Sequence, residues 1–115
     1  MIIVFAEDQT VSVFPDVDSV RRECETVDVE KGVYSFFDEF GRHLLPRWTA
    51  PVQRKGGLFG WMGSVGGGSF ELELNLQDNG LAFQTSMANV VAMEPNRMFE
   101  TIADLARLVA ENRGR

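Results

Sequence analysis

The chain of 115 residues offers one histidine and one cysteine for chemistry, His43 and Cys24. Catalysis by a serine or cysteine nucleophile needs a base within hydrogen-bonding reach, so any such site would have to include His43. The best-placed serine, Ser64, lies in the run MGSVG, which lacks the first glycine of a nucleophile elbow. We therefore expect a protein that is not an enzyme, with His43 as a polar surface residue and Cys24 as a small buried hydrophobic one.

Metal and cofactor sites are not expected either. One cysteine and one histidine cannot supply the ligands of a structural zinc ion. The paired carboxylates occupy positions typical of a helix cap, a turn and a solvent-facing strand, and none has the spacing of a calcium-binding loop; they are Asp16/Asp18, Asp38/Glu39 and Glu71/Glu73.

The most unusual segment spans residues 54–68, where seven glycines alternate with large apolar side chains. Glycine loops that bind phosphate have a fixed spacing between a strand and a helix, and this segment lacks that spacing. Each large apolar side chain left in water forgoes about 1.5–3 kcal/mol of burial, so it should be covered, either by a partner or by folding back as a flap over a sheet edge or an end of the core. Because Trp and Met are favoured in interface centres, we predict a partner-binding surface here; its residues are Phe59, Trp61 and Met62, with Arg54 and Lys55 beside them.

Charge is distributed unevenly along the chain. Residues 1–39 carry a net charge of −7, residues 40–70 carry +4 without any acidic residue, and residues 71–115 carry −3. An acidic protein binds the nucleic-acid backbone poorly, but its acidic surface can attract a basic protein. A second predicted partner-binding surface therefore surrounds the first helix, at Asp16, Asp18, Glu23 and Glu25.

Length and composition bound the class of protein. With 44% hydrophobic residues, the chain can build one core, so we expect a single domain over residues 1–115 with an irregular glycine-rich segment at 49–68. No apolar run approaches the length of a membrane span, and the N-terminus lacks the basic leader of a secretory signal. We expect a cytoplasmic protein without a membrane partner, which suits its single cysteine.

The first half of the chain predicts strands and one helix. Apolar, β-branched runs favour strands at residues 2–6 and 11–14. Asp16 offers a helix cap, and the apolar spacing after it predicts a helix to about residue 27. Aromatic content predicts a strand at 33–37, which returns at 42–45 through a turn with a left-handed Gly41, and Pro46 should limit the return strand.

The second half has the clearest strand pattern. Apolar and polar residues alternate from Phe70 to Gln77, and residues 78–80 have turn chemistry that would let residues 81–85 pair back. Residues 86–93 are ambiguous, and an apolar stripe from Met98 to Val109 predicts a helix ending near Gly114. The fold class is thus α+β: a mainly antiparallel sheet of about six strands in the order β-β-α-β-β-β-β-α, with two helices on one face.

Residues 27–42, VDVEKGVYSFFDEFGR, resemble a pattern in small bacterial proteins of the immunity type. In these cytoplasmic antidotes of polymorphic or contact-delivered toxins, a short helix precedes an acidic turn, an aromatic strand and a Phe-Asp-Glu-x-Gly-Arg hairpin. The resemblance covers about residues 1–48 and implies no particular binding residues.

These observations predict a non-catalytic binding protein that inhibits a partner protein, specifically an immunity protein that neutralises a bacterial toxin. The apolar loop is the preferred contact and the acidic helix region the second. Two alternatives stay open. One is a small domain that closes the loop over a ligand or anion using Arg47, Arg54 and Lys55; the other is a homo-oligomer that buries the loop between copies.

Overall fold

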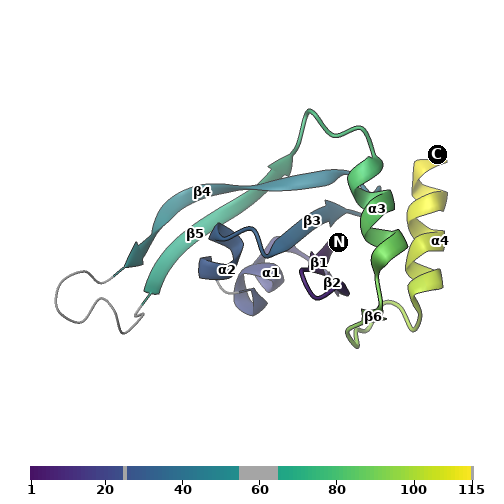
Figure 1. The fold of residues 1–115 in the computed structure, drawn as a ribbon, viewed down its shortest axis with the longest axis horizontal. Helices are drawn as coiled ribbons and strands as arrows, with labels where there is room; N and C mark the ends of the chain where they lie inside the picture. The colour runs from purple at the N-terminus through teal and green to yellow at the C-terminus, as the bar shows by residue number, and fades with distance from the viewer. Residues whose placement is uncertain (25, 55–64, 115) are drawn as a thin grey trace.

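The protein forms a six-stranded sheet in the order β5-β4-β3-β1-β2-β6 (Figure 1). The computed structural model describes residues 1–24, 26–54 and 65–114. All neighbouring strands are antiparallel except β2 and β6, so the predicted α+β class and mainly antiparallel sheet are confirmed. The strands are β1 (Ile2–Ala6), β2 (Thr10–Phe14), β3 (Tyr34–Asp38), β4 (His43–Arg54), β5 (Val65–Leu74) and β6 (Ala92–Met93).

Helices cover both faces of this sheet, so the expected placement of two helices on one face is wrong. The helices are α1 (Val17–Glu23), α2 (Thr26–Glu30), α3 (Leu81–Asn89) and α4 (Ile102–Arg113). Along β1, Ile2 and Val4 belong to a buried cluster with residues of α1 and α2, whereas Ile3 and Phe5 belong to a second cluster with residues of α3 and α4. A continuous apolar run is typical of a strand buried on both faces, and β1 has that sequence.

The first predicted helix is two short helices. Asp16 caps α1 as expected, because its Oδ1 accepts a hydrogen bond of 2.8 Å from the main-chain N–H of Ser19. Cys24 then adopts an extended conformation, with φ −95° and ψ 122°, which ends the first helix before α2 begins. The resulting bend lets Val20, Cys24 and Val29 all reach the same buried cluster.

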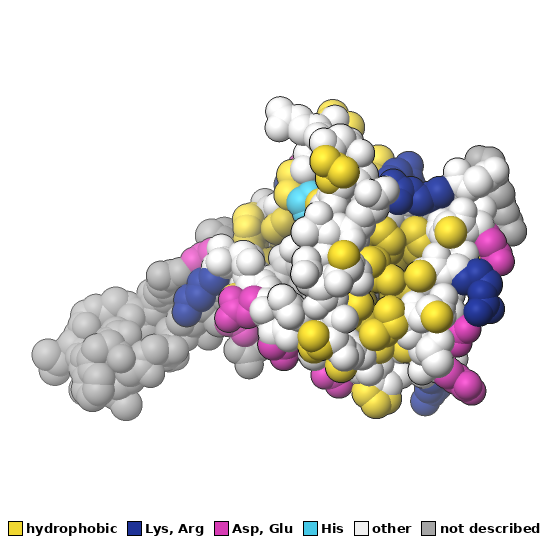
Figure 2. Space-filling view, turned by 45° about the vertical axis from the view of Figure 1, so that its right-hand side comes forward, with side chains coloured by type: hydrophobic (Ala, Val, Ile, Leu, Met, Phe, Trp, Pro, Cys, Tyr) yellow, Lys and Arg dark blue, Asp and Glu magenta, His cyan; other side chains and the backbone are white. Residues whose placement is uncertain are grey.

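The predicted strand at 81–85 is part of helix α3. Asp78 and Gly80 therefore form the connection between β5 and α3 rather than a hairpin turn, with Gly80 at a φ of 85°. Phe83 and Met87, four residues apart, lie on one helix face and pack in the α3/α4 cluster. Figure 2 turns this side of the molecule forward and shows hydrophobic side chains gathered in a strip between two ridges of the surface.

The turn between β3 and β4 forms as predicted. Asp38 Oδ1 accepts hydrogen bonds of 2.9 Å from the N–H groups of both Phe40 and Arg42, and Gly41 has a φ of 74°. Such a left-handed backbone favours glycine, and the carboxylate fixes the direction of the turn. Asn112 Nδ2 of α4 donates to Glu39 O at 2.8 Å and ties the turn to the last helix.

Strands β4 and β5 form a hairpin far longer than the sequence suggested. β4 has 12 residues and β5 has 10, which correspond to about 30–40 Å of extended chain. Residues 49–54 and 65–68, expected in an irregular segment, are therefore strand, while residues 55–64 lie outside the described residues. No helix in the described part of the chain is long and apolar enough to cross a membrane.

Pro46 ends the pairing of β4 with β3, not β4 itself. Asn75 N–H donates to His43 O at 2.9 Å, so the main chain of His43 faces β5 and that of Leu44 faces β3. Pro46, two residues further, faces the same side as Leu44 but has no N–H to donate. The paired residues of β3 and β4 accordingly stop at Phe36 and Leu44.

Candidate functional site

The outer part of the β4–β5 hairpin is a ribbon of two strands. Beyond Leu44, β5 is the only strand that pairs with β4 among the described residues. Figure 1 shows the ribbon extending past β3 and away from α3 and α4. Its base is anchored by Phe70, which is fully buried and packs edge-on against Trp48 at a centroid distance of 5.5 Å. The hairpin therefore begins in the core, extends beyond the rest of the sheet and leads into residues 55–64.

Most residues of the predicted loop surface lie outside the described part of the chain. They are Phe59, Trp61, Met62 and Lys55, and Arg54 is the last residue of β4. Arg47, which the anion-binding alternative requires, faces Glu73 across the two strands at an Nε–Oε2 distance of 3.4 Å. Because this carboxylate already neutralises Arg47, the arginine is less suited to hold a separate anion.

The predicted acidic surface is partly engaged within the protein. Besides the Ser19 amide, Asp16 accepts a hydrogen bond from the Ser19 hydroxyl; these bonds lower the pKa of Asp16, with a smaller effect from Arg22. Asp18 pairs with Arg21 at 2.8 Å, and Arg21 also reaches Glu71 of β5 at 3.1 Å. Glu23 borders a cleft, and Glu25 lies outside the described residues. Asp16 and Asp18 thus stabilise α1 and its contact with the sheet edge.

Arg21 also closes part of the free edge of β5. Its Nη1 donates to Phe70 O at 3.4 Å while the same nitrogen contacts the Glu71 carboxylate. A sheet edge with unpaired main-chain groups tends to pair with other chains, and a charged side chain placed across it opposes that pairing. Glu71 and Arg21 therefore have a structural role that the sequence did not indicate.

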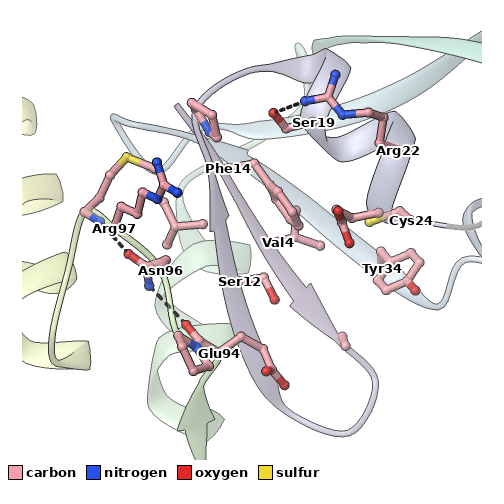
Figure 3. A pocket seen from close by; sticks show the side chains of 16 residues that line it. Val4, Ser12, Phe14, Ser19, Arg22, Cys24, Tyr34, Glu94, Asn96 and Arg97 are labelled. Carbon is pink, nitrogen blue, oxygen red and sulfur yellow. Dashed lines mark hydrogen bonds between the residues drawn. The ribbon is translucent and has the colours of Figure 1, made fainter.

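A cleft of about 940 Å³ lies on the α1 side of the sheet, next to the short strand β6 (Figure 3). It forms because α1 and α2 pack toward β4 and β5 and leave the ends of β1 and β2 uncovered. Residues far apart in the sequence line it, among them Val4, Ser12, Phe14, Arg22, Tyr34, Glu94 and Arg97. A volume of this order is typical of ligand sites. The sequence analysis assigned none of these residues to a site.

Sequence signals for this cleft are weak. The apolar stripe predicts a helix from about Met98, but the last helix begins only at Ile102, so Arg97 lies in the irregular segment before it. Pro95 and Asn96 mark a break after a strand, and Asn96 Oδ1 accepts hydrogen bonds from the N–H groups of Met98 and Phe99. This turn directs the chain away from the sheet, which opens the cleft. The long-range pairing of β6 with β2 is what brings this turn next to the cleft on the α1 side of the sheet.

Cys24 borders the same cleft but is 6% exposed. Burial raises the pKa of its thiol to about 11, and the neighbouring charges of Glu23 and Asp28 add to the effect. Since thiolate is the reactive form, we expect iodoacetamide at pH 8 to alkylate native Cys24 about a hundredfold more slowly than the urea-unfolded chain. Mass spectrometry of timed samples measures both rates. Equal rates would contradict the buried position of the thiol.

His43, Asn75 and Asp78 form a polar cluster where β4 begins and β5 ends. Asn75 Nδ2 lies 3.1 Å from His43 Nδ1, and the imidazole packs on the Phe37 ring at a centroid distance of 5.2 Å. Asp78 accepts hydrogen bonds from the main-chain N–H groups of His43 and Gly80, at 2.9 and 3.0 Å. These contacts order the connection from β5 to α3 and give His43 a structural role. Among the described residues, no group of three His, Cys, Asp or Glu side chains could hold a metal ion.

Asp78→Ala should destabilise the protein in a pH-dependent way. The hydrogen bond from the His43 main chain is the largest cause of a lowered Asp78 pKa. A lowered folded-state pKa gives stability that is present above the unfolded value, about 3.9, and is lost as the pH falls through the folded pKa. Urea unfolding should show a loss of about 1 kcal/mol at pH 7 that shrinks below pH 4. Glu100→Ala, at an exposed position, is the control, and a loss independent of pH would contradict the expectation.

Comparisons with family models, curated proteins and solved structures found no match to this chain.

Proposed function

We propose that this protein is a non-catalytic binding protein that inhibits a partner protein, most specifically an immunity protein that neutralises a bacterial toxin. The observation that carries the proposal is the β4–β5 hairpin, whose two strands continue beyond the rest of the sheet. They lead directly into residues 55–64, which contain Leu58, Phe59, Trp61 and Met62 among four glycines. Trp is among the residues that contribute most to binding energy at interfaces.

The anchoring of the hairpin supports this role. A binding element held by a rigid base loses less conformational entropy on association than a free loop does. Trp48, Phe70 and Phe36 form a chain of aromatic contacts from the hairpin into the core, with centroid distances of 5.5 and 6.2 Å. The base of the hairpin is therefore anchored in the core, and its strands lead from there to an apolar contact at their end.

The loop is the preferred contact over the acidic helix region. Asp16 and Asp18 are already engaged in the cap of α1 and in the ion pair with Arg21. Their charges still contribute to the acidic field of the protein, which can speed the approach of a basic toxin. Affinity would then depend on Phe59, Trp61 and Met62, and the acidic residues would mainly affect the association rate.

The test uses the protein encoded beside this chain's gene as the candidate toxin. Expressed alone it should arrest growth, and co-expression of the wild-type chain should restore it. Phe59→Ser/Trp61→Ser should abolish rescue and weaken binding by on the order of a hundredfold or more, since each hot-spot residue is worth about 2 kcal/mol. Leu76→Ser is the matched control, because Leu76 is 93% exposed on another loop.

Four outcomes would contradict the proposal. Growth of cells that express the neighbouring protein without this chain would show that the neighbour is not a toxin. Equal rescue by the loop variant and the Leu76 variant would show that the loop is not the contact. A rise in melting temperature with phosphate, without any bound protein, would favour the anion-binding alternative. A mass by light scattering that falls in the loop variant would favour a homo-oligomer instead.

A further inference from the structure

The cleft beside β6 contains a free stretch of sheet edge. β6 pairs with only two residues of β2, since Thr10 lies opposite Ala92 and Val11 opposite Met93. Glu94 N–H then donates to Val11 O at 2.8 Å, and the chain turns away at Pro95. Residues 12–14 of β2 thus have no neighbour strand on this side within the described part of the chain.

Val13 presents its main chain to the cleft. The carbonyl of Val11 faces β6, and main-chain groups alternate along a strand, so the N–H and C=O of Val13 point to the same edge. The Val13 side chain is buried in the cluster under α3 and α4, on the opposite face of the sheet. It therefore borders the cleft through its backbone N–H and C=O, which pair with no strand there in the part of the chain that the structure describes.

Apolar and positively charged side chains surround this edge. Val4 and Phe14 line the cleft beside it, and Figure 3 shows Phe14 between Arg97 and the hydrogen-bonded pair of Arg22 and Ser19. Arg22 Nη2 donates to Ser19 Oγ at 3.1 Å. Neither Arg22 nor Arg97 has a carboxylate within ion-pair distance among the described residues.

Two carboxylates also border the cleft, those of Glu23 and Glu94. Glu94 follows β6, where the main chain already occupies the edge of β2. The open position at Val13 lies further along β2, next to Phe14 in the strand, and Figure 3 shows Phe14 on the side of Arg97. A segment that pairs with Val13 would therefore run beside the arginines, and Glu94 would lie at its other end.

We propose that this cleft binds an extended peptide segment that carries an acidic side chain. The segment pairs with the main chain of Val13 and continues the sheet where β6 stops, a known mode of peptide recognition. Its apolar residues pack on the half-buried Phe14, and its carboxylate accepts hydrogen bonds from Arg97 and Arg22, the strong charge-assisted kind. The cleft is separate from the hairpin, so this site does not depend on the proposed inhibitory function.

The probe is a displayed library of random ten-residue peptides, selected on the full-length protein. We expect enriched peptides to alternate apolar residues with at least one Asp or Glu. Fluorescence polarisation should then show that Arg97→Glu weakens their binding about tenfold or more, because a like charge replaces a charge-assisted donor. Arg107→Glu, an exposed arginine of α4 on the opposite side of the sheet, should leave binding unchanged.

Amide exchange measured by NMR tests the strand pairing directly. The Val13 N–H should become protected when the selected peptide binds, whereas the Ser12 N–H, which faces Val4 of β1, should not change. Any of three results would overturn the proposal: no enrichment over a blank selection, peptides without acidic residues, or binding that leaves Val13 exchange unaffected. A failure of the chain to rescue cells from the toxin would not affect this test of peptide binding.

Discussion

Replacing Phe37 with alanine should remove about 3–5 kcal/mol from the free energy of unfolding, a large share of the total for a domain of this size. The Phe37 ring is fully buried and lies at the centre of the α3/α4 cluster. Its centroid lies 5.6 Å from that of Phe5 and 5.3 Å from that of Phe83, both in edge-on contacts. Truncation would leave a cavity between β1, β3 and α3 that the surrounding helices cannot close.

Urea unfolding followed by far-UV circular dichroism measures this loss. Phe40→Ala is the matched control, because Phe40 is half-buried in the β3–β4 turn and the Arg42 Cζ lies 4.8 Å from the centroid of its ring. It should cost about 1 kcal/mol. If Phe37→Ala does not fold, Phe37→Leu keeps most of the volume and should still lose more stability than Phe40→Ala. Equal losses for the Phe37 and Phe40 variants would contradict this description of the core.

Local sequence signals predicted the parts of the fold that depend on neighbouring residues. Asp38 and Gly41 sit three residues apart and fix the β3–β4 turn through their own hydrogen bonds and backbone angle, so no distant contact was needed. The alternation of Phe70 and Leu72 with Glu71 and Glu73 gave the inner part of β5 for the same reason. The Asp16 cap also depends on a residue only three positions away.

Long-range contacts determined the elements that the sequence analysis missed. Residues 81–85 have no strict alternation, and the packing of Phe83 against Phe5 and Phe37 selects a helix there. Helices on both faces were foreseeable from the continuous apolar run of β1, but which helix covers which face was not. The cleft depends on β6 pairing with β2 across about eighty positions of sequence, and no local pattern encodes that register.

The candidate functional residues likewise divide into those predicted by local sequence and those determined by long-range contacts. The apolar and glycine-rich composition of residues 55–64 is a local property, so the sequence predicts a contact surface there directly. The Asp18–Arg21 pair lies within α1, but the pairs of Arg21 with Glu71 and of Arg47 with Glu73 arise only when α1 packs on β5 and β4 pairs with β5. Sequence charge counts treated these residues as free, and the structure shows that each has a partner within the protein.

Three glycines with the same backbone conformation should differ sharply in their tolerance of alanine. Gly32, Gly41 and Gly80 have φ values of 75°, 74° and 85°, so an added side chain strains each backbone by a similar amount, about 1–2 kcal/mol. Around Gly32, apart from its chain neighbours, no atom of the described residues lies within 4 Å of the added Cβ. At Gly80 the near atom is the guanidinium end of Arg113, at 2.8 Å, and this flexible side chain can move away.

Gly41→Ala should be the most damaging of the three variants. Its Cβ would lie 3.0 Å from Phe83 Cδ1 and 3.1 Å from Val109 Cγ1, and both side chains are buried and held by the core. Forcing them apart should add about 1–3 kcal/mol of overpacking to the backbone strain, for a total loss of about 2–5 kcal/mol. Thermal and urea unfolding of the three variants measure the difference. The backbone cost is the same in both variants, so the loss of stability in Gly41→Ala minus that in Gly32→Ala measures how tightly α3 and α4 pack against the β3–β4 turn. A difference near zero would mean that this contact is loose.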